Sequence, residues 1–132
     1  MGLLIDSSIF VAAERGVLNF ERLLADFADE PAALSAVTAS ELLHGVHRAD
    51  AEHRGAREAY VAGILSQFPV KPFDLPTART YARLLAERAS QGRPIAPHDL
   101  IIAATAMTLG LRVVTRDARS FPTITGLSVV IP

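Results

Sequence analysis

The sequence predicts an α/β fold in which a doubly wound parallel sheet of about five strands is flanked by helices on both faces. Short aliphatic segments alternate along the chain with longer segments of helical periodicity. Several of the short segments lack an alternation of polar and apolar residues, which is typical of parallel strands covered on both sides. Hydrophobic residues make up 50% of the chain and charged residues 20%, as expected where some elements are buried all round.

Five segments have the composition of strands. They are short, mostly rich in aliphatic or β-branched residues, and bounded by polar or turn residues. The third contains two prolines, which suit only the edge of a sheet because proline cannot donate a ladder hydrogen bond. The five segments are 2–6, 33–37, 69–73, 112–115 and 127–131.

Helical segments lie between these strands. Segments 19–28 and 51–68 carry apolar stripes, although two glycines weaken the second. In 75–91, apolar residues recur every 3.6 residues, with arginine and glutamate on the opposite face. A last helix begins with Pro97 in its first turn and ends at Gly110. Strands that alternate with helices in this way indicate a doubly wound sheet with right-handed crossovers.

Length and composition restrict the class of protein. A chain of 132 residues has the length of one ordinary domain, so we expect residues 1–132 to form a single domain. The chain has no cysteine, which is compatible with a reducing compartment, and we expect a cytoplasmic protein. It has neither a basic signal region nor an apolar run of about 20 residues, so we expect no membrane association. Its net charge of -1 leaves any binding of nucleic acid to a local site.

Four acidic residues are expected at one end of the predicted sheet. Doubly wound sheets bind ligands outside the carboxyl ends of their strands, where the strand order reverses. Asp6 ends the first strand, Glu41 follows the second by one helical turn, and Asp117 ends the fourth. Asp99 lies in the first turn of the helix that leads into that fourth strand. Converging carboxylates are ligands for hard divalent ions, which points to Mg2+ or Mn2+.

Each acid also has a purely structural interpretation. Asp6 and Asp117 could cap the helices that follow them, and Glu41 could complete a capping box that begins at Thr38. Asp99 could be favoured in a first turn by the helix dipole. For any single acid these uses are the commoner ones, but capping does not require all four to share one end of the sheet.

Asp74 is a fifth acid that follows a predicted strand. It is interpreted as the N-cap of a helix that has Pro76 just inside its start. The two prolines of 69–73 also place that strand at an edge, away from the point where the strand order reverses. Asp74 is therefore left out of the candidate site.

The segments that carry the four acids resemble the motifs of a known family. LLIDSSIF, TASELLHG, PHDLIIAATA and VVTRDARSF are similar to the four motifs of the PIN-domain ribonucleases, particularly the VapC-type toxins of bacterial toxin-antitoxin pairs. The motifs run in family order, and the resemblance covers essentially the whole chain. It implies a PIN-like fold and an endoribonuclease that hydrolyses RNA with Mg2+ or Mn2+. By this resemblance the catalytic and metal-binding residues are Asp6, Glu41, Asp99 and Asp117.

The resemblance also implies partners and further contacts. It implies a homodimer and a cognate antitoxin protein. The apolar stripes of 19–28 and 51–68 have two interpretations: they could dock an antitoxin helix, or they could simply pack against the sheet. Thr115 and Ser7, or Ser8, match hydroxyl positions near the metal, with ordinary turn hydroxyls as the alternative. Arg116 lies at the predicted crevice, next to the fourth acid, and is a candidate contact of RNA.

Two other classes of function share parts of this pattern. A receiver-like phosphoacceptor domain also has an acidic pocket, but it uses a lysine near the fifth strand, and Lys71 lies elsewhere. A non-catalytic interaction module would keep the fold and lose one or more acids, whereas all four are present. Several basic side chains could line a phosphate path, with a solvated helix face as the simpler interpretation: Arg48, Arg54, Arg57, His47 and His53.

Overall fold

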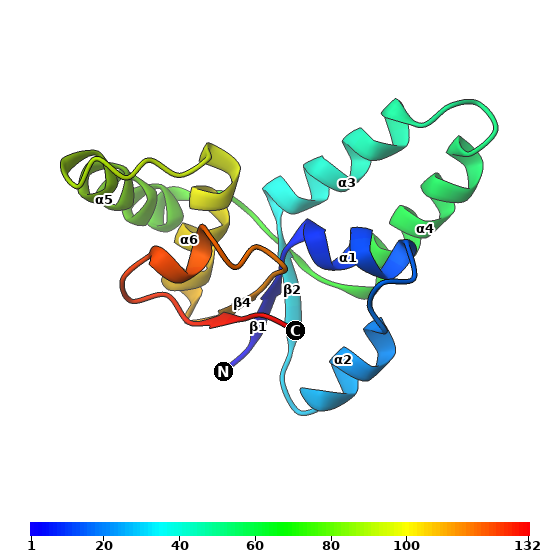
Figure 1. Cartoon of the computed structure of the whole chain (residues 1–132), viewed down its shortest axis with the longest axis horizontal. Helices are drawn as coiled ribbons and strands as arrows, with labels where there is room; N and C mark the ends of the chain where they lie inside the picture. Colours follow the sequence, from blue (N-terminus) through cyan, green and yellow to red (C-terminus); the bar gives the residue numbers. More distant parts are fainter.

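A five-stranded parallel sheet forms the centre of the protein in the computed structural model, which describes all 132 residues (Figure 1). The strands lie in the order β3-β2-β1-β4-β5, and every neighbouring pair is parallel. All five predicted strands are present, and the strand that contains the prolines lies at an edge as predicted. Their bounds are β1 (Leu3–Ile5), β2 (Ala32–Ser35), β3 (Val70–Lys71), β4 (Arg112–Val114) and β5 (Val129–Val130).

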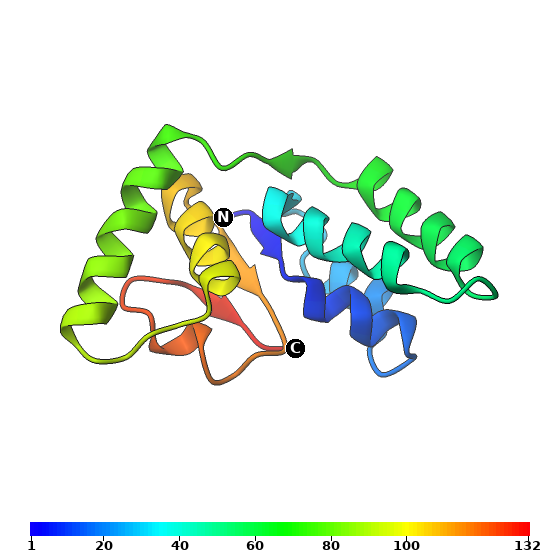
Figure 2. The same ribbon diagram turned by 90° about the horizontal axis from the view of Figure 1, so that it is seen from above.

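Six α-helices cover the two faces of this sheet. Figure 1 shows α1 to α4 on one side of the sheet and α5 and α6 on the other, and Figure 2 shows the same separation from above. A short 3-10 helix, η1 (Phe121–Thr123), packs on the side of α6. The α-helices are α1 (Ser7–Glu14), α2 (Phe20–Asp26), α3 (Ala36–Arg48), α4 (Arg54–Gln67), α5 (Leu75–Ser90) and α6 (Pro97–Leu109).

Two hydrophobic cores lie on the two faces of the sheet. Successive side chains of a strand point to opposite faces, so Leu3 and Ile5 of β1 join the core under α1 to α4, and Leu4 joins the core under α5 and α6. Phe10 of α1 is fully buried in the first core, with aromatic neighbours from α2 and the end of α4. The Tyr60 hydroxyl of α4 donates to the Phe10 carbonyl at 2.8 Å. These contacts fix α1, which carries the first residues of the site.

The predicted ends of α5 and α6 are confirmed. Helix α6 begins at Pro97 and ends at Gly110, whose φ of 67° is the left-handed conformation that glycine adopts without strain. Asp74 caps α5 by accepting a hydrogen bond from the Thr77 N–H at 3.2 Å. Asp74 therefore has the structural role that the sequence predicted for it.

The start of α3 differs from the capping box considered for Glu41. The strand before it ends at Ser35, and the Ser35 hydroxyl caps α3 by accepting from the Thr38 N–H at 3.1 Å. The capping-box interpretation is wrong because the helix begins three residues earlier than it requires. Glu41 consequently lies in the second turn of α3, and its side chain is not used as a cap.

The apolar stripes of 19–28 and 51–68 face the core. Leu23 of α2 and Val61 and Ile64 of α4 are buried, and their apolar neighbours pack against the same cluster. The packing interpretation accounts for most of these residues. No helix combines the length and the hydropathy needed to cross a bilayer.

Candidate functional site

The candidate site lies at the carboxyl ends of β1 and β4, the neighbouring strands at which the strand order reverses. Asp6 directly follows β1, and Thr115 directly follows β4. The Asp6 N–H donates to the Val114 carbonyl at 2.9 Å, which extends the pairing of the two strands to their last residues. Because these strands are parallel and adjacent, side chains that follow them necessarily meet.

The carboxylate of Asp6 is held by hydroxyl groups from both sides. Asp6 is 6% exposed, and its Oδ2 accepts hydrogen bonds from Ser8 Oγ at 2.7 Å and from Thr115 Oγ1 at 2.8 Å. Ser8 Oγ in turn accepts from the Arg116 N–H at 3.0 Å, and Thr115 Oγ1 accepts from the Asp117 N–H at 3.0 Å. Both hydroxyls donate to the same oxygen, so Oδ1 of Asp6 takes no part in this network. Asp6 occupies the N-cap position of α1, but its side chain makes no capping hydrogen bond.

Glu41 approaches Asp6 from α3. Its Oε1 atom is buried and has no hydrogen-bond partner, and its Oε2 atom lies 4.0 Å from Nδ1 of His98. Burial, the charge of Asp6 and then that of Asp99 raise the pKa of Glu41, while His98 and the Ser7 hydroxyl act in the opposite direction. A buried carboxylate oxygen without a donor is costly, and a cation is the natural partner for it.

Asp99 and Asp117 complete the acidic cluster. Asp99 lies half-buried in the first turn of α6, and burial followed by the charges of Asp6 and Asp117 raises its pKa. Asp117 follows β4, and its Oδ1 accepts from the N–H groups of Arg119 at 2.9 Å and Ser120 at 3.0 Å. These backbone hydrogen bonds lower the pKa of Asp117 against the effect of burial. Asp117 thus caps a turn and also faces the cluster.

The structure therefore brings all four predicted acids to one end of the sheet, from four separate segments. No three carboxylate or histidine side chains are arranged as a ready-made set of ligands for one ion. The chemistry of the donors nevertheless fits a hard divalent ion, because all four are carboxylates and Oε1 of Glu41 is buried without a partner.

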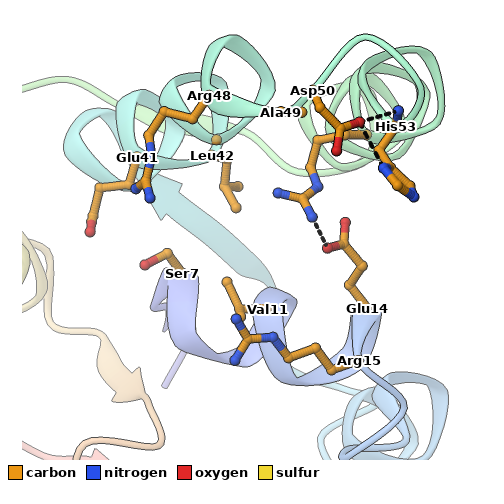
Figure 3. Close-up of a pocket in the computed structure, with 12 residues that line it drawn as sticks. Ser7, Val11, Glu14, Arg15, Glu41, Leu42, Arg48, Ala49, Asp50 and His53 are labelled. Atoms are coloured by element: carbon orange, nitrogen blue, oxygen red, sulfur yellow. Dashed lines mark hydrogen bonds and ion pairs between the residues drawn. The ribbon is translucent and has the colours of Figure 1, made fainter.

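A cleft of about 520 Å³ leads away from the acidic cluster between α1 and α3. Figure 3 shows Ser7 and Glu41 facing each other at one end of this cleft, with Arg15 and Arg48 extending toward that end. Neither of these two arginines forms a salt bridge. Two other basic side chains in the cleft have acidic partners: Arg57 pairs with Glu14 at 2.8 Å, and His53 Nδ1 lies 2.7 Å from Asp50 (Figure 3).

Some basic residues considered from the sequence lie outside this cleft. Arg54 donates to the Ala49 carbonyl at 2.7 Å and does not line the cleft. His47 lies with His44 on the opposite side of α3, near β3. Arg15, which does line the cleft, was missed because nothing in the sequence of α1 shows which residue will face α3.

The other candidate contacts lie at the opposite flank of α1. Arg116 is exposed and lines a second hollow together with Ser8 and Arg15. Arg15 thus lines both hollows, one on each flank of α1. Lys71 lies in β3, at the edge of the sheet opposite to β5, which is inconsistent with the lysine of a receiver-like domain.

Comparisons with known proteins agree with this fold. The family model described as PIN domain matches residues 3–127. Ribonuclease VapC1 of Rickettsia felis is 35% identical over 131 residues, which cover 98% of this chain and 96% of that protein. The tRNA(fMet)-specific endonuclease VapC of Shigella flexneri is 35% identical over 94 residues, which cover 71% of this chain and 70% of that protein.

Solved structures show the same architecture. A chain in the crystal structure of FitAcB from Neisseria gonorrhoeae superposes with a TM-score of 0.82 at 31% identity, covering 96% of this chain and 95% of that one. A chain of VapBC2 from Rickettsia felis, bound to a DNA fragment of its promoter, has a TM-score of 0.90 at 22% identity and covers 100% of this chain and 99% of that one.

A parallel sheet of this order, with carboxylates gathered where the strand order reverses, defines a PIN domain, and the chain belongs to that family. Within the family it is a VapC ribonuclease, the toxin component of a toxin-antitoxin system.

Proposed function

We propose that this ribonuclease is an endonuclease that depends on Mg2+ or Mn2+ held by Asp6, Glu41, Asp99 and Asp117. The observation that carries the proposal is the convergence of four carboxylates at the reversal point, where burial and mutual repulsion raise the pKa of Glu41 and Asp99. One of these carboxylates has a buried oxygen without a hydrogen-bond donor. Such a cluster is electrostatically unfavourable by itself and favours a bound cation.

The residues around the cluster have distinct roles in this proposal. Ser8 and Thr115 orient Asp6 by donating to Oδ2 and leave Oδ1 for the ion. The backbone N–H groups of Arg119 and Ser120 lower the pKa of Asp117 and so favour its ionised form. Lewis-acid activation of the attacking water, and neutralisation of phosphate charge, are the chemistry that a divalent ion supplies at such a site. No nucleophilic side chain is required.

The substrate proposed for this site is an RNA strand whose backbone follows the cleft between α1 and α3. A phosphate that approaches four acids is repelled by them, so cations on either flank assist binding. Arg48 and Arg15 line the cleft without acidic partners, and Arg116 lies beyond the cluster on the other flank of α1. Ser7, at the end of the cleft beside Glu41, is a further proposed contact.

We also propose a cognate antitoxin protein as the partner of this chain, together with a homodimer and a cytoplasmic site of action. Solved relatives include the VapBC complexes of Rickettsia felis and Salmonella typhimurium, and FitAcB of Neisseria gonorrhoeae, which supports the partner. Co-expression with the neighbouring reading frame should restore growth to cells that the chain alone inhibits.

An end-labelled RNA assay tests the proposed activity. Purified chain that has been stripped of metal with EDTA should leave the RNA intact, and added Mg2+ or Mn2+ should restore internal cleavage with 5'-phosphate and 3'-hydroxyl ends. Equal cleavage in EDTA and in Mn2+ would mean that the four acids do not act through a metal.

A further inference from the structure

Arg88, near the carboxyl end of α5, is a buried cation without an ion pair. The residue is 7% exposed, and no carboxylate lies within salt-bridge distance of its guanidinium group. Burying a charge is expensive unless hydrogen bonds replace the lost water. Two backbone carbonyls do so here: Nε donates to the Arg93 carbonyl at 2.6 Å, and Nη1 donates to the Thr123 carbonyl at 3.1 Å.

The first of these carbonyls belongs to the loop that delivers Asp99. Arg93 lies between α5 and α6, and its own N–H donates back to the Arg88 carbonyl at 3.0 Å. Ile95, in the same loop, packs against the core under α6. The loop then enters α6 at Pro97, two residues before Asp99, so its position fixes where the first turn of α6 begins.

The second carbonyl belongs to the turn that follows Asp117. Thr123 ends η1, and its N–H and hydroxyl both donate to the Ser120 carbonyl, at 3.3 Å and 2.7 Å. The Ser120 N–H donates to Oδ1 of Asp117 at 3.0 Å. A continuous series of hydrogen bonds therefore connects Arg88 to Asp117 through Thr123 and Ser120.

We propose that Arg88 is a positioning residue that sets the separation of Asp99 and Asp117 by holding together the two segments that carry them. This inference rests on the proposed metal-dependent function. The two carboxylates repel each other, and they come from segments that β4 separates, so a link between those segments opposes their spreading. Metal ligands must be held within a few tenths of an ångström of their place, and groups behind the ligands supply that precision.

The test compares two arginines of the same chain. Arg88→Met removes both hydrogen bonds and keeps an unbranched apolar side chain of about the length of the arginine stem. Arg112→Met is the matched control, because Arg112 is also largely covered, with its guanidinium paired to Glu30 and 5.0 Å from the centre of the Phe27 ring, at the opposite end of the sheet. For each variant, the apo melting temperature, the Kd for Mn2+ by titration calorimetry, and kcat and KM for RNA are measured.

Both variants should melt at a lower temperature than the unmodified chain, but only Arg88→Met should lose metal affinity. We expect its Kd for Mn2+ to rise by about 10- to 100-fold, the range known for groups behind metal ligands, with a lower kcat and an unchanged KM. Thr123→Val removes the hydroxyl that contacts Ser120 and should weaken Mn2+ binding in the same direction. Arg88→Lys keeps the positive charge but cannot reach both carbonyls at once, and it provides the measurement if Arg88→Met does not fold.

An unchanged Kd for Mn2+ in Arg88→Met, or in Arg88→Lys where Arg88→Met is unfolded, would overturn the inference and leave Arg88 with a purely structural role. An equal loss of Mn2+ affinity in Arg112→Met would overturn it too, because the effect would then reflect general destabilisation. If the unmodified chain neither binds Mn2+ nor cleaves RNA with it, the proposed metal-dependent function fails, and the role of Arg88 fails with it.

Discussion

Thr115 Oγ1 donates a hydrogen bond to Oδ2 of Asp6 at 2.8 Å, which joins the ends of β4 and β1 at the reversal point of the sheet. The same hydroxyl accepts from the Asp117 N–H, so one side chain orients two of the four acids. Thr115 is fully buried, and replacement of its hydroxyl by a methyl group would leave both partners without water to compensate.

Thr115→Val should therefore weaken both folding and the site. We expect a loss of about 1–3 kcal/mol in the free energy of unfolding, because the buried Asp6 oxygen and the partly buried Asp117 N–H each lose a partner. Mn2+ affinity should fall as well, since Asp6 is then held by the Ser8 hydroxyl alone. Urea unfolding and calorimetry measure the two effects. Thr105→Val is the control: Thr105 is equally buried, but its hydroxyl donates only to the Ile101 carbonyl within α6, so Mn2+ affinity should not change.

Substitution of single acids should distinguish the proposed metal ligands from acids that only cap helices. Asp99→Asn should abolish RNA cleavage in Mn2+, because an amide oxygen is a weaker ligand for a hard cation and the other three acids cannot compensate. Asp74→Asn should retain wild-type activity, since Asn still caps α5 and lies outside the site. Circular dichroism confirms that both variants are folded. Wild-type cleavage by Asp99→Asn would contradict the assignment of this residue.

The fold and the four acids could be predicted because each depends on local pattern together with one topological rule. Alternation of aliphatic strands and amphipathic helices identifies a doubly wound sheet, and prolines mark its edge at β3. The carboxyl ends of parallel strands then meet whatever the details of packing. The strand and helix pattern and this rule are sufficient to predict that Asp6, Asp99 and Asp117 lie at the same end of the sheet.

The remainder of the site depends on contacts that no local pattern encodes. Ser7 and Ser8 are adjacent serines, and only the direction of the first turn of α1 decides that Ser8 reaches Asp6. The contact between Arg88 and Thr123 joins residues 35 positions apart, through the packing of α5 against η1. The position of Glu41 within α3 was predicted wrongly. The strand before α3 ends at Ser35, earlier than the aliphatic composition of 33–37 indicates, so Glu41 lies in the second helical turn.

The cleft between α1 and α3 predicts a role for two arginines in substrate affinity. The double variant Arg15→Ala and Arg48→Ala should raise KM for RNA more than it lowers kcat, because both side chains line the cleft and neither belongs to the acidic cluster. Each lost phosphate contact should also reduce the slope of log K against log salt by about 0.7 for a single strand. Arg79→Ala, at an exposed arginine of α5 outside the cleft, is the control. An unchanged KM in the double variant would place the RNA elsewhere.

The raised pKa values of Glu41 and Asp99 predict how the stability of the metal-free protein depends on pH. A carboxyl whose pKa is higher in the folded state binds its proton more tightly there than in the unfolded chain, so the folded state is favoured at low pH. This contribution is lost as pH rises from the ordinary carboxyl pKa of about 4 through the raised value. The lowered pKa of Asp117 has the opposite sign, and its contribution is lost as pH falls below about 4. Between about pH 4 and neutrality, the contributions of Glu41 and Asp99 are the ones that change, so the melting temperature of the metal-free protein should decrease as pH increases.

Asp99→Asn should remove the part of this dependence that comes from Asp99, because it removes a half-buried charge that Asp6 and Asp117 also repel. The part that comes from Glu41, whose pKa is raised mainly by burial and by Asp6, should remain. The apo melting temperature of Asp99→Asn at neutral pH should exceed that of the wild type, although the helix dipole of α6 favours the acid by about 0.3–1 kcal/mol. In the wild type, Mn2+ at a hundredfold excess over its Kd should add about 2.7 kcal/mol, and thereby raise the melting temperature by roughly 10 °C. In Asp99→Asn the rise should be much smaller.

Asp99→Ala should behave in the same way as Asp99→Asn, because the N-cap of α6 is Ala96 and not Asp99. Melting curves of the three proteins with and without Mn2+ decide the matter: a lower apo melting temperature in both variants, with the metal response intact, would mean that Asp99 serves its helix alone.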